Sequence, residues 1–367
     1  MPQAIIVGGG IAGLAAGIAF TNAGWDVTVL ERAAQIRPMG AALSLWPNAS
    51  AAMASIGVLN AVNASAAPIR RMLLADQNGQ AILTRPLPGP AIMSTRANLQ
   101  NALLVSLGSE RIRLSAVVDQ VSAERVTMAN GETLTCDLVV DAGGIRAPSE
   151  AGSPPHYAGY GGVLALSGSV EGAGLGGLAA EYWGKHQRFG VFELPNNRRY
   201  WFYMRTQPAD APMPDLAKCA AAAEDWAPSV GRAIAATPAG ALIPFAVHAK
   251  PPPKTLLAPG ILRVGDAAHA MEPNLGQGAC QGLEDAAALQ AIAAAVPADK
   301  VAIHYERLRL KRTQMFVRES ALGRLGAHGS RPVRSIMRMA LKAVPLAISE
   351  PRICDMQTMP DYASAVR

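Results

Sequence analysis

Three glycines near the start of the chain have the spacing of a phosphate-binding turn. Gly8, Gly10 and Gly13 follow a short apolar run and precede apolar residues at helical spacing, within the segment 4–20. In such a strand–turn–helix unit, the first glycine allows a tight turn and the second lets the backbone approach a pyrophosphate. The third lets the helix lie close on the strand. The spacing therefore predicts a dinucleotide site at the end of a buried strand.

An acidic residue follows at the distance that ribose binding requires. The stretch 26–30 is typical of a second strand, and Glu31 follows it, 23 positions beyond Gly8. A carboxylate at this point accepts hydrogen bonds from the hydroxyls of an adenosine ribose. The N–H groups of Ile11 and Ala12, at the start of the helix, have no intrahelical partner and can bind a diphosphate.

A second glycine-containing turn, far along the chain, indicates which dinucleotide binds. Asp266 follows the short strand 261–264, and Gly276, Gln277 and Gly278 precede a long Ala-rich helix. Backbone N–H groups at this helix start can stabilise negative charge on a reduced flavin. Asp266 can bind a ribityl or ribose hydroxyl. Two helix starts suit FAD, both ends of which must be held, better than NAD.

The histidine and cysteine spacing predicts no metal site. His269 has no ligand partner nearby in the sequence, so we expect a structural role for it. The four cysteines lack C-x-x-C spacing, which favours reduced thiols over disulfides or metal ligands. They are Cys136, Cys219, Cys280 and Cys354.

Composition indicates a large and well-buried protein. Half of the 367 residues are hydrophobic and 16% are charged, so one large domain or two interleaved domains are expected. We find no signal peptide and no apolar run of about 18 residues. We therefore expect a cytoplasmic protein without a membrane span.

The positive charge is concentrated near the end of the chain. The stretch 305–342 holds ten Lys or Arg and two Glu, whereas the net charge of the whole chain is +6. Such a stretch could contact a membrane surface, an acidic partner or nucleic acid. Aromatic residues do not interleave with the cations, which argues against nucleic acid. We interpret the stretch as packed helices with a solvated basic face.

Aromatic and cationic side chains gather in a predicted β-hairpin, 188–205. A two-residue turn at Asn196–Asn197 would place Arg188 and Tyr203 on one face and Tyr200 on the other. One extra bulged residue would reverse that choice. The residues alone leave both registers open.

A second Gly-x-Gly-x-x-Gly motif, at 172–177, is expected to be a loop. The segment after it, 178–189, contains Gly184 and too few periodic apolar residues for a packed helix. We therefore expect one dinucleotide-binding domain in this chain.

Together these motifs resemble the single-component FAD-dependent aromatic hydroxylases, the flavoprotein monooxygenases of the salicylate and p-hydroxybenzoate hydroxylase type. The resemblance runs from residue 4 to about residue 300. It rests on the first fingerprint with Glu31 and Arg32, on 40–48, on Arg96 within Thr-Arg-Ala-Asn-Leu, and on the Gly-Asp to Glu-Asp run at 265–285.

The resemblance implies an α/β fold, with a Rossmann-like FAD-binding domain, an inserted β-sheet substrate domain and a helical C-terminal tail. The expected FAD-binding domain is 1–70, 94–156 and 256–298, the β-rich substrate domain is 71–93 and 157–255, and the C-terminal helical segment is 299–367. The expected FAD contacts are Gly8, Gly10, Ile11, Ala12, Gly13, Glu31, Arg32, Arg96, Asp266, Gly276, Gln277 and Gly278. Pro273 is expected beside the reacting edge of the flavin, with Arg188 and Tyr200 facing it as the other candidate catalytic residues.

The resemblance also implies a reaction. NADH or NADPH reduces FAD, O2 adds at flavin C4a, and the hydroperoxide transfers one oxygen atom to an aromatic or heteroaromatic small molecule. Arg188 and Tyr200 would bind an anionic ring and assist its deprotonation. A monomer or homodimer is expected. Epoxidation, Baeyer–Villiger oxidation and a flavin-binding protein without turnover are the alternatives.

One segment departs from the family pattern. Relatives usually have Gly-Ala-Asp-Gly-x-x-Ser-x-Val-Arg after the strand 138–140, and this chain has Gly143, Ala147 and Glu150 in place of the Asp, Ser and Arg. In the family that Asp serves both FAD and the nicotinamide cofactor. Losing such a charged hydrogen bond costs about 1.5–3 kcal/mol, roughly 10- to 100-fold in affinity. Asp141 lies about 6–7 Å away along the strand end, so we predict weakened or altered use of NAD(P)H.

Overall fold

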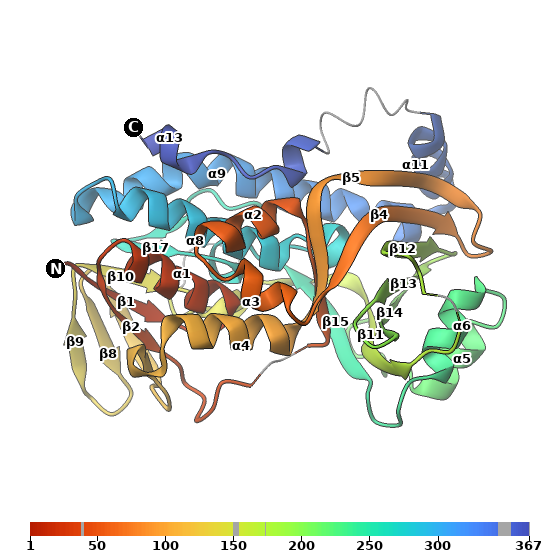
Figure 1. Ribbon diagram of the computed structural model, residues 1–367, viewed down its shortest axis with the longest axis horizontal. Helices are drawn as coiled ribbons and strands as arrows, with labels where there is room; N and C mark the ends of the chain where they lie inside the picture. Colours follow the sequence, from red (N-terminus) through yellow and green to blue (C-terminus); the bar gives the residue numbers. More distant parts are fainter. Residues whose placement is uncertain (38–39, 150–153, 173, 344–353, 367) are drawn as a thin grey trace.

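The chain folds around two large β-sheets, which Figure 1 shows beside each other under a layer of helices. The computed structural model describes residues 1–37, 40–149, 154–172, 174–343 and 354–366. Glu150 and residue 173 of the second glycine motif lie outside this range. The division into domains predicted above stays a prediction in its boundaries.

The first sheet has six strands in the order β16-β17-β10-β1-β2-β6. Its central strand β1 pairs in parallel with β2 and β10, and β10 pairs in parallel with β17. Parallel strands are covered on both faces, which explains the unbroken apolar run of β1. The strands are β1 (Gln3–Val7), β2 (Asp26–Leu30), β6 (Ile112–Arg113), β10 (Leu138–Asp141), β16 (Leu257–Ala258) and β17 (Ile261–Arg263).

The extended segment after η1 (Ser109–Arg111) is divided into two strands, β6 and a second strand that begins at Val118. Ser115, between them, has φ +56°, a left-handed conformation that interrupts an extended chain. The second of the two, β7 (Val118–Ser122), forms a separate three-stranded sheet with β8 (Arg125–Met128) and β9 (Thr133–Thr135).

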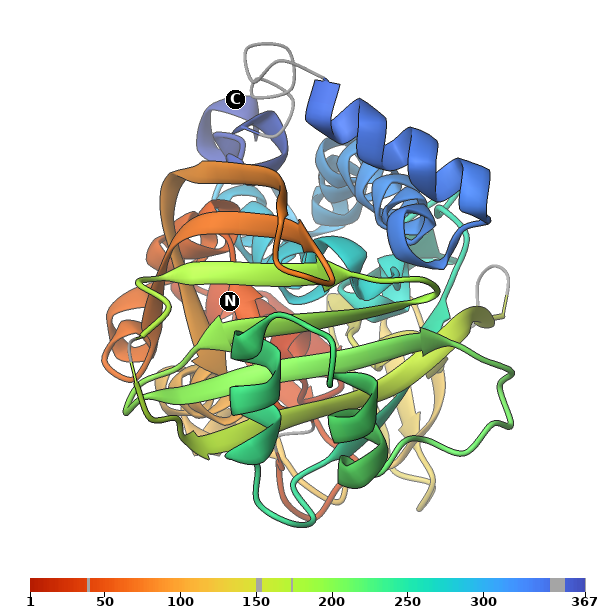
Figure 2. The same ribbon diagram turned by 90° about the vertical axis from the view of Figure 1, so that its right-hand side faces the viewer.

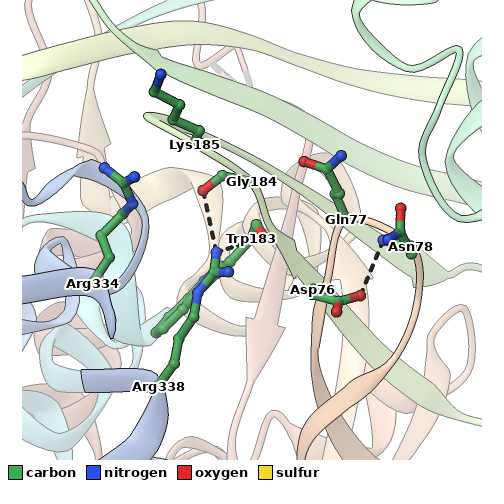
Figure 3. Close-up of a pocket in the computed structure, with 8 residues that line it drawn as sticks. All are labelled: Asp76, Gln77, Asn78, Trp183, Gly184, Lys185, Arg334 and Arg338. Atoms are coloured by element: carbon green, nitrogen blue, oxygen red, sulfur yellow. Dashed lines mark hydrogen bonds between the residues drawn. The ribbon is translucent and has the colours of Figure 1, made fainter. Parts of the chain in front are cut away.

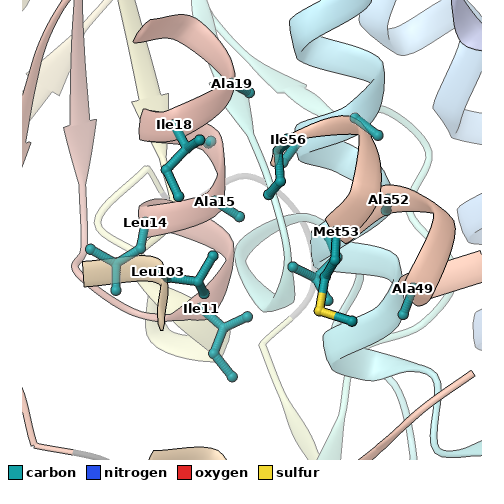
Figure 4. Close-up of a cluster of buried hydrophobic side chains, with 14 of the residues drawn as sticks. Ile11, Leu14, Ala15, Ile18, Ala19, Ala49, Ala52, Met53, Ile56 and Leu103 are labelled. Carbon is teal, nitrogen blue, oxygen red and sulfur yellow. The ribbon is translucent and has the colours of Figure 1, made fainter. Parts of the chain in front are cut away.

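Helix α1 (Ile11–Asn22) lies in the centre of the main core and is buried along most of its length. It packs against α4 (Arg96–Leu107) and α8 (Gly278–Ala293), and α8 in turn packs against α2 (Pro47–Ser55). Figure 4 labels Ile18 and Leu14 of α1, Ile56 beyond α2 and Leu103 of α4, all of which belong to this cluster. Shorter helical turns are α3 (Leu59–Asn63), η1 (Ser109–Arg111), η2 (Gly144–Arg146), α7 (Asp266–His269) and η3 (Pro273–Leu275).

The second sheet has eight strands in the order β15-β11-β14-β13-β12-β4-β5-β3. They are β3 (Ala42–Leu45), β4 (Ala67–Asp76), β5 (Ala81–Thr95), β11 (His156–Ser169), β12 (Leu178–Trp183), β13 (Gln187–Glu193), β14 (Arg198–Thr206) and β15 (Ile243–Ala249). The motif at 172–177 precedes strand β12 rather than a helix, so its described residues form the predicted loop. Two helices that the sequence did not indicate, α5 (Leu216–Ala222) and α6 (Pro228–Ala235), cover one face of this sheet (Figure 2).

The register of the β13–β14 hairpin decides the choice that the sequence left open. Arg188 pairs with Met204, and Phe192 pairs with Tyr200. Cross-strand partners and residues two apart share a face, so Arg188 and Tyr200 lie on the same side of the sheet. The connection is the segment 195–197, one residue longer than the two-residue turn that would separate them.

The C-terminal part consists of helices α9 (Ala298–Gly323), α10 (Leu325–His328), α11 (Arg331–Ala343) and α13 (Tyr362–Val366). Arg309 of α9 is completely buried, and so is Glu284 of α8. Arg309 donates hydrogen bonds to Glu284 at 2.7 Å and to Asp285 at 2.9 Å. Arg334 is also buried. The expected solvated basic face is therefore wrong for these two arginines.

His269 is part of the same buried network. Its Nε2 lies 2.7 Å from the Asp285 carboxylate, which also accepts the N–H of Gly265 at 2.9 Å. Burial opposes ionisation of Asp285, but His269 and Arg309 hold the pKa of its carboxyl well below the usual range. The structural role predicted for His269 is confirmed.

We predict that Arg309→Leu lowers the free energy of unfolding by about 3–5 kcal/mol, because it removes the fully buried cation that pairs with both carboxylates and leaves Glu284 with Arg312 and Asp285 with His269. Urea unfolding of the purified protein measures this. Arg318→Leu is the matched control, since Arg318 is exposed on the same helix. Equal unfolding midpoints for the two variants would contradict the prediction.

Candidate active site

The turn after β1 has the geometry of a phosphate-binding loop. Gly8 has φ +110°, and a Cβ atom there would lie 2.5 Å from the carbonyl oxygen of Ala142. A Cβ atom on Gly13 would lie 1.9 Å from the carbonyl oxygen of Gly8, so α1 sits directly against the end of β1. At Gly10, by contrast, no atom lies within 4 Å of the Cβ position. The three glycines therefore serve the turn, the close packing and the open approach that their spacing predicts.

The start of α1 presents its backbone rather than its side chains. Gly10 is the N-cap, and no side chain caps the helix. The side chain of Ile11 is buried in the main core, so only its N–H group can contact a ligand. Unpaired N–H groups and the positive end of the helix dipole together favour a phosphate here.

Glu31 reaches this turn from the end of β2. Its Oε2 accepts a hydrogen bond from the N–H of Gly9 at 2.8 Å, and its Oε1 accepts one from Ala33 at 2.9 Å. Each carboxylate oxygen has a second lone pair, so a ribose hydroxyl can bind at the same group. Arg32, the next residue, is exposed.

Arg96 and Asp266 are the first residues of α4 and α7. Thr95 caps α4 by accepting the N–H of Asn98 at 3.1 Å. Burial lowers the pKa of Arg96, and the charge of Asp266 opposes that shift. The two side chains are therefore close enough to act on each other although their helices are distant in the sequence. The stem of Arg96 lies beside Gly40.

Small residues place the start of α7 against the start of α1. A Cβ atom on Gly265 would lie 2.6 Å from the Cβ of Ala12, and one on Gly282 of α8 would lie 3.1 Å from it. Gly265 also has φ +57°. Ala12 thus fixes the distance between the helices that carry the two glycine motifs.

The segment 276–278 can contact a ligand only through its backbone. Gly276 has φ +63°, and a Cβ atom there would lie 2.6 Å from the hydroxyl of Ser44. Gln277 is 3% exposed, and its side-chain oxygen accepts a hydrogen bond from Asn48 at 2.9 Å. At Gly278 no atom lies within 4 Å of the Cβ position. The Gln277 side chain therefore points inward, and the N–H groups of the α8 start are the available donors.

These features fit an extended dinucleotide of the size of FAD. Three predicted contact residues follow the carboxyl ends of strands in one parallel sheet: Glu31 follows β2, Gly10 follows β1, and Asp266 follows β17. Strands β1 and β2 are direct neighbours, and β10 lies between β1 and β17. Ligands of open α/β sheets bind at this edge. The open Cβ positions at Gly10 and Gly278 leave space at both ends of such a ligand.

Pro273 lies in the connection between α7 and α8. It begins η3, and the preceding Glu272 is 2% exposed. Glu272 accepts hydrogen bonds from the hydroxyl of Tyr160 in β11 and from Arg324, each at 3.0 Å. Asn274 donates to the carbonyl oxygen of Ser320 in α9 at 2.7 Å. The loop that carries Pro273 is thus held from the second sheet and from the C-terminal helices.

Arg188 is a buried cation on the face of the second sheet that turns away from α5 and α6. Its Nη1 donates to Glu181 at 2.9 Å, and its Cζ lies 5.3 Å from the ring centre of Phe202. Within the described part of the chain, its Nε has no hydrogen-bond partner. A buried N–H group without a partner is costly, so a ligand oxygen is the expected acceptor.

Tyr200 borders open space on the same face. Strand β14 lies between β11 and β13, and its neighbours Trp201 and Tyr203 are buried under α5 and α6. Tyr200 is nevertheless only half-buried. Its remaining exposed surface therefore opens toward the layer that holds the dinucleotide-binding edge.

The two candidate residues keep their protons at physiological pH. Burial raises the pKa of the Tyr200 hydroxyl, and the charge of Arg188 reduces that shift only in part. Burial alone would lower the pKa of Arg188, but Glu181 and Tyr160 outweigh that effect, so the pKa of Arg188 is raised above its ordinary value. His328, stacked on Tyr160, stays neutral, because burial and the charge of Arg188 lower its pKa to about 3. Tyr200 is therefore a hydrogen-bond donor, not a base.

The loop that departs from the family pattern is closed by Asp141. This carboxylate is fully buried and accepts the N–H of Gly143 at 2.8 Å and the N–H of Ser149 at 2.9 Å. A Cβ atom on Gly143 would lie 3.0 Å from Oδ1 of Asp141. This carboxylate is therefore closer to position 143 than the about 6–7 Å expected from strand spacing, although its oxygens accept hydrogen bonds within its own loop. A Cβ atom on Gly143 would lie 2.8 Å from Pro148.

Sequence reasoning missed three residues of this site. Tyr160, Glu181 and Glu272 come from β11, β12 and the turn before η3, and no spacing relates them. Only Glu272 had a usable signal, because it directly precedes the predicted Pro273.

Comparison with known proteins agrees with the geometry. Residues 1–320 match the FAD binding domain family. The chain is 31% identical to the aurachin C monooxygenase/isomerase of Stigmatella aurantiaca, over 88% of this chain and 89% of that protein. It is 32% identical to the 2-heptyl-3-hydroxy-4(1H)-quinolone synthase of Pseudomonas aeruginosa, with the same shares covered.

A solved structure shows the same fold. HpxO of Klebsiella pneumoniae, complexed with FAD and uric acid, superposes with a TM-score of 0.85 at 24% identity, over 97% of this chain and 96% of that one. At this level of identity the likeness concerns the fold alone. The family match and the two relatives go further: the chain belongs to the FAD binding domain family and is an FAD-dependent flavoprotein monooxygenase.

Proposed function

We propose that this monooxygenase hydroxylates a heteroaromatic ring that carries a carbonyl or ionisable hydroxyl group, with O2 as co-substrate and NADH or NADPH as reductant. The observation that carries the proposal is Arg188, a buried cation whose Nε lacks a partner and which lies on one sheet face with Tyr200. The names of the relatives support it, since one makes a hydroxyquinolone and the structural neighbour holds uric acid.

The side chains of this face suit a flat ring. Phe192, Phe202 and Tyr200 form a cluster of three rings: the ring centres of Phe192 and Phe202 lie 5.6 and 6.3 Å from that of Tyr200 and 6.2 Å from each other. Such a wall packs against the apolar part of a ring. Arg188 and Tyr200 would then donate hydrogen bonds to its oxygen atoms, and a guanidinium stabilises an oxygen that becomes negative.

Bound FAD supplies hydride acceptance and O2 activation. The protein's own contribution is placement and the exclusion of water. Pro273 would limit solvent access beside the ring, because η3 is fixed through Glu272 to Tyr160 and Arg324. The donors at the start of α8 would stabilise negative charge on the flavin. Both roles need the substrate carbon to be held close to the reacting edge.

Tyr200→Phe removes one hydrogen-bond donor without changing the shape of the wall. We predict that kcat/KM falls roughly 3- to 30-fold.

Arg188→Met removes a charged hydrogen-bond donor. We predict that kcat/KM falls at least about 30-fold, mainly because KM rises. The measurement is substrate-dependent NAD(P)H oxidation over a set of quinolones, purines and phenolic acids, with product mass showing the addition of one oxygen.

The matched control is Tyr203→Phe, which removes a hydroxyl from the opposite face of the same strand, where it donates to Gln187 at 2.7 Å. It should leave kcat/KM unchanged. If Tyr200→Phe behaves as Tyr203→Phe does, the proposed face is wrong. If no tested ring stimulates oxidation or gains oxygen, hydroxylation itself is wrong.

The missing acid at position 143 gives a prediction for the reductant. Restoring it requires Pro148 to be reduced in size and brings a second carboxylate beside Asp141, because a Cβ atom on Gly143 would lie 2.8 Å from Pro148 and 3.0 Å from Oδ1 of Asp141. We expect the double variant Gly143→Asp, Pro148→Ala to bind NADH or NADPH about 10- to 100-fold more tightly than the parent chain, through one charged hydrogen bond. Anaerobic stopped-flow reduction of the flavin gives these dissociation constants.

Pro148→Ala alone is the control for the change in loop shape and should leave the dissociation constant as it is. The prediction is contradicted if the parent chain already binds NADH or NADPH tightly and its flavin is reduced rapidly, with the same dissociation constant and rate in the double variant. Position 143 would then not limit the use of the reductant.

A further inference from the structure

Helix α11 lies at the outer surface of the molecule, over the end of the second sheet (Figures 1 and 2). One side of it is packed: Met337 and Leu341 contact a small cluster formed by Ile82, Trp183 and Ala327. Arg338 secures the contact, since its Nη2 donates to the carbonyl oxygen of Trp183 at 2.8 Å.

The other side of α11 is apolar and exposed. Val333, Ile336 and Met339 are 36%, 61% and 64% exposed. Pro332 and Ala340 are also exposed. Residues three and four positions apart lie on the same face of a helix, so these five side chains fall within about a third of the helix circumference. We call this apolar face the α11 stripe. Large apolar side chains gathered in this way indicate a contact surface.

The charges on helix α11 itself are all positive, and the adjoining pocket also contains Asp76. Helix α11 contains Arg331, Arg334, Arg338 and Lys342 and no acidic residue, and Arg331 and Lys342 are exposed at its two ends. Figure 3 shows Arg334 and Arg338 beside a surface pocket, with Lys185 across it. An apolar stripe bordered by cations is the pattern of a helix that lies in the plane of a membrane surface.

We propose that α11 docks this protein on an anionic phospholipid bilayer. The α11 stripe enters the boundary between headgroups and acyl chains, and the cations meet lipid phosphates. Among the described helices, none is long and apolar enough to cross a membrane, so the contact is peripheral. Charge complementarity selects this occupant: a second copy would bring the same cations against each other.

Docking in this way would bring the Arg188 end of the second sheet toward the bilayer. Trp183, under α11, pairs with Arg188 across β12 and β13. The neighbouring α10 contacts the same wall, since His328 stacks on Tyr160 with ring centres 4.3 Å apart. The docking helix is thus built directly onto one wall of the candidate active site.

The test is flotation of the FAD-loaded full chain with two kinds of vesicle, one of phosphatidylcholine alone and one of an equimolar mixture with phosphatidylglycerol. We expect binding to the anionic vesicles, little binding to the neutral ones, and release at high salt. The double variant Ile336→Asp, Met339→Asp should lower the partition coefficient at least about tenfold.

The matched control is Val105→Asp, Ile303→Asp, which changes two equally exposed apolar residues on α4 and α9 and should bind as the parent does. Flavin absorbance and melting temperature establish that each variant is folded. The proposal is overturned by absent binding to anionic vesicles, or by equal binding of the α11 variant. A dimer that only the α11 variant dissociates would also overturn it, because the stripe would then cover a second copy.

Discussion

The site depends on how closely two helix starts approach one strand end. Gly13 lets α1 touch the carbonyl of Gly8, and Gly265 and Gly282 let α7 and α8 close on Ala12. A Cβ atom at Gly13 would lie 1.9 Å from the Gly8 carbonyl oxygen and one at Gly265 would lie 2.6 Å from the Cβ of Ala12, so a larger side chain at either point would push the helices apart. Because the approach is so close, residues from opposite ends of the chain form a single edge along which one extended cofactor can lie.

A buried charge network fixes that arrangement from behind. Arg309 joins α9 to Glu284 and Asp285 of α8, and Asp285 in turn holds the N–H of Gly265. The negative charge of the carboxylate that holds the α7 start is therefore favoured by His269 and by Arg309 of the C-terminal helix α9. Such a network is weak evidence for net stability, but it fixes the position of α7 and α8 relative to α1. Tertiary structure at the C-terminal end thus supports chemistry that the N-terminal motif begins.

What the sequence could predict was local. Gly8, Gly10, Gly13 and Glu31 gave the dinucleotide turn, because their roles depend on neighbours in one short unit. The register of Arg188 and Tyr200 could not be derived in the same way, since one residue more or less in a connecting loop reverses it.

The buried partners could be predicted least. Tyr160 meets Glu272 across more than a hundred residues, and no pattern in either segment indicates it. Arg309 belongs to a basic stretch, so the sequence predicts an exposed, solvated charge. It is buried because the acids that pair with it, Glu284 and Asp285, lie on a different helix. Composition reports how many charges a segment has, whereas burial depends on what the rest of the chain places opposite them.

The central claim, that FAD spans both helix starts, can be tested with two substitutions into open space. Gly10 and Gly278 have no atom within 4 Å of the Cβ position and no left-handed backbone angle, so valine fits either site in the protein without FAD. The measurement is the affinity of the deflavinated variants for FAD and for ADP. The account predicts that Gly10→Val weakens both ligands, whereas Gly278→Val weakens FAD and leaves ADP unchanged. Unchanged FAD affinity in Gly278→Val would contradict it.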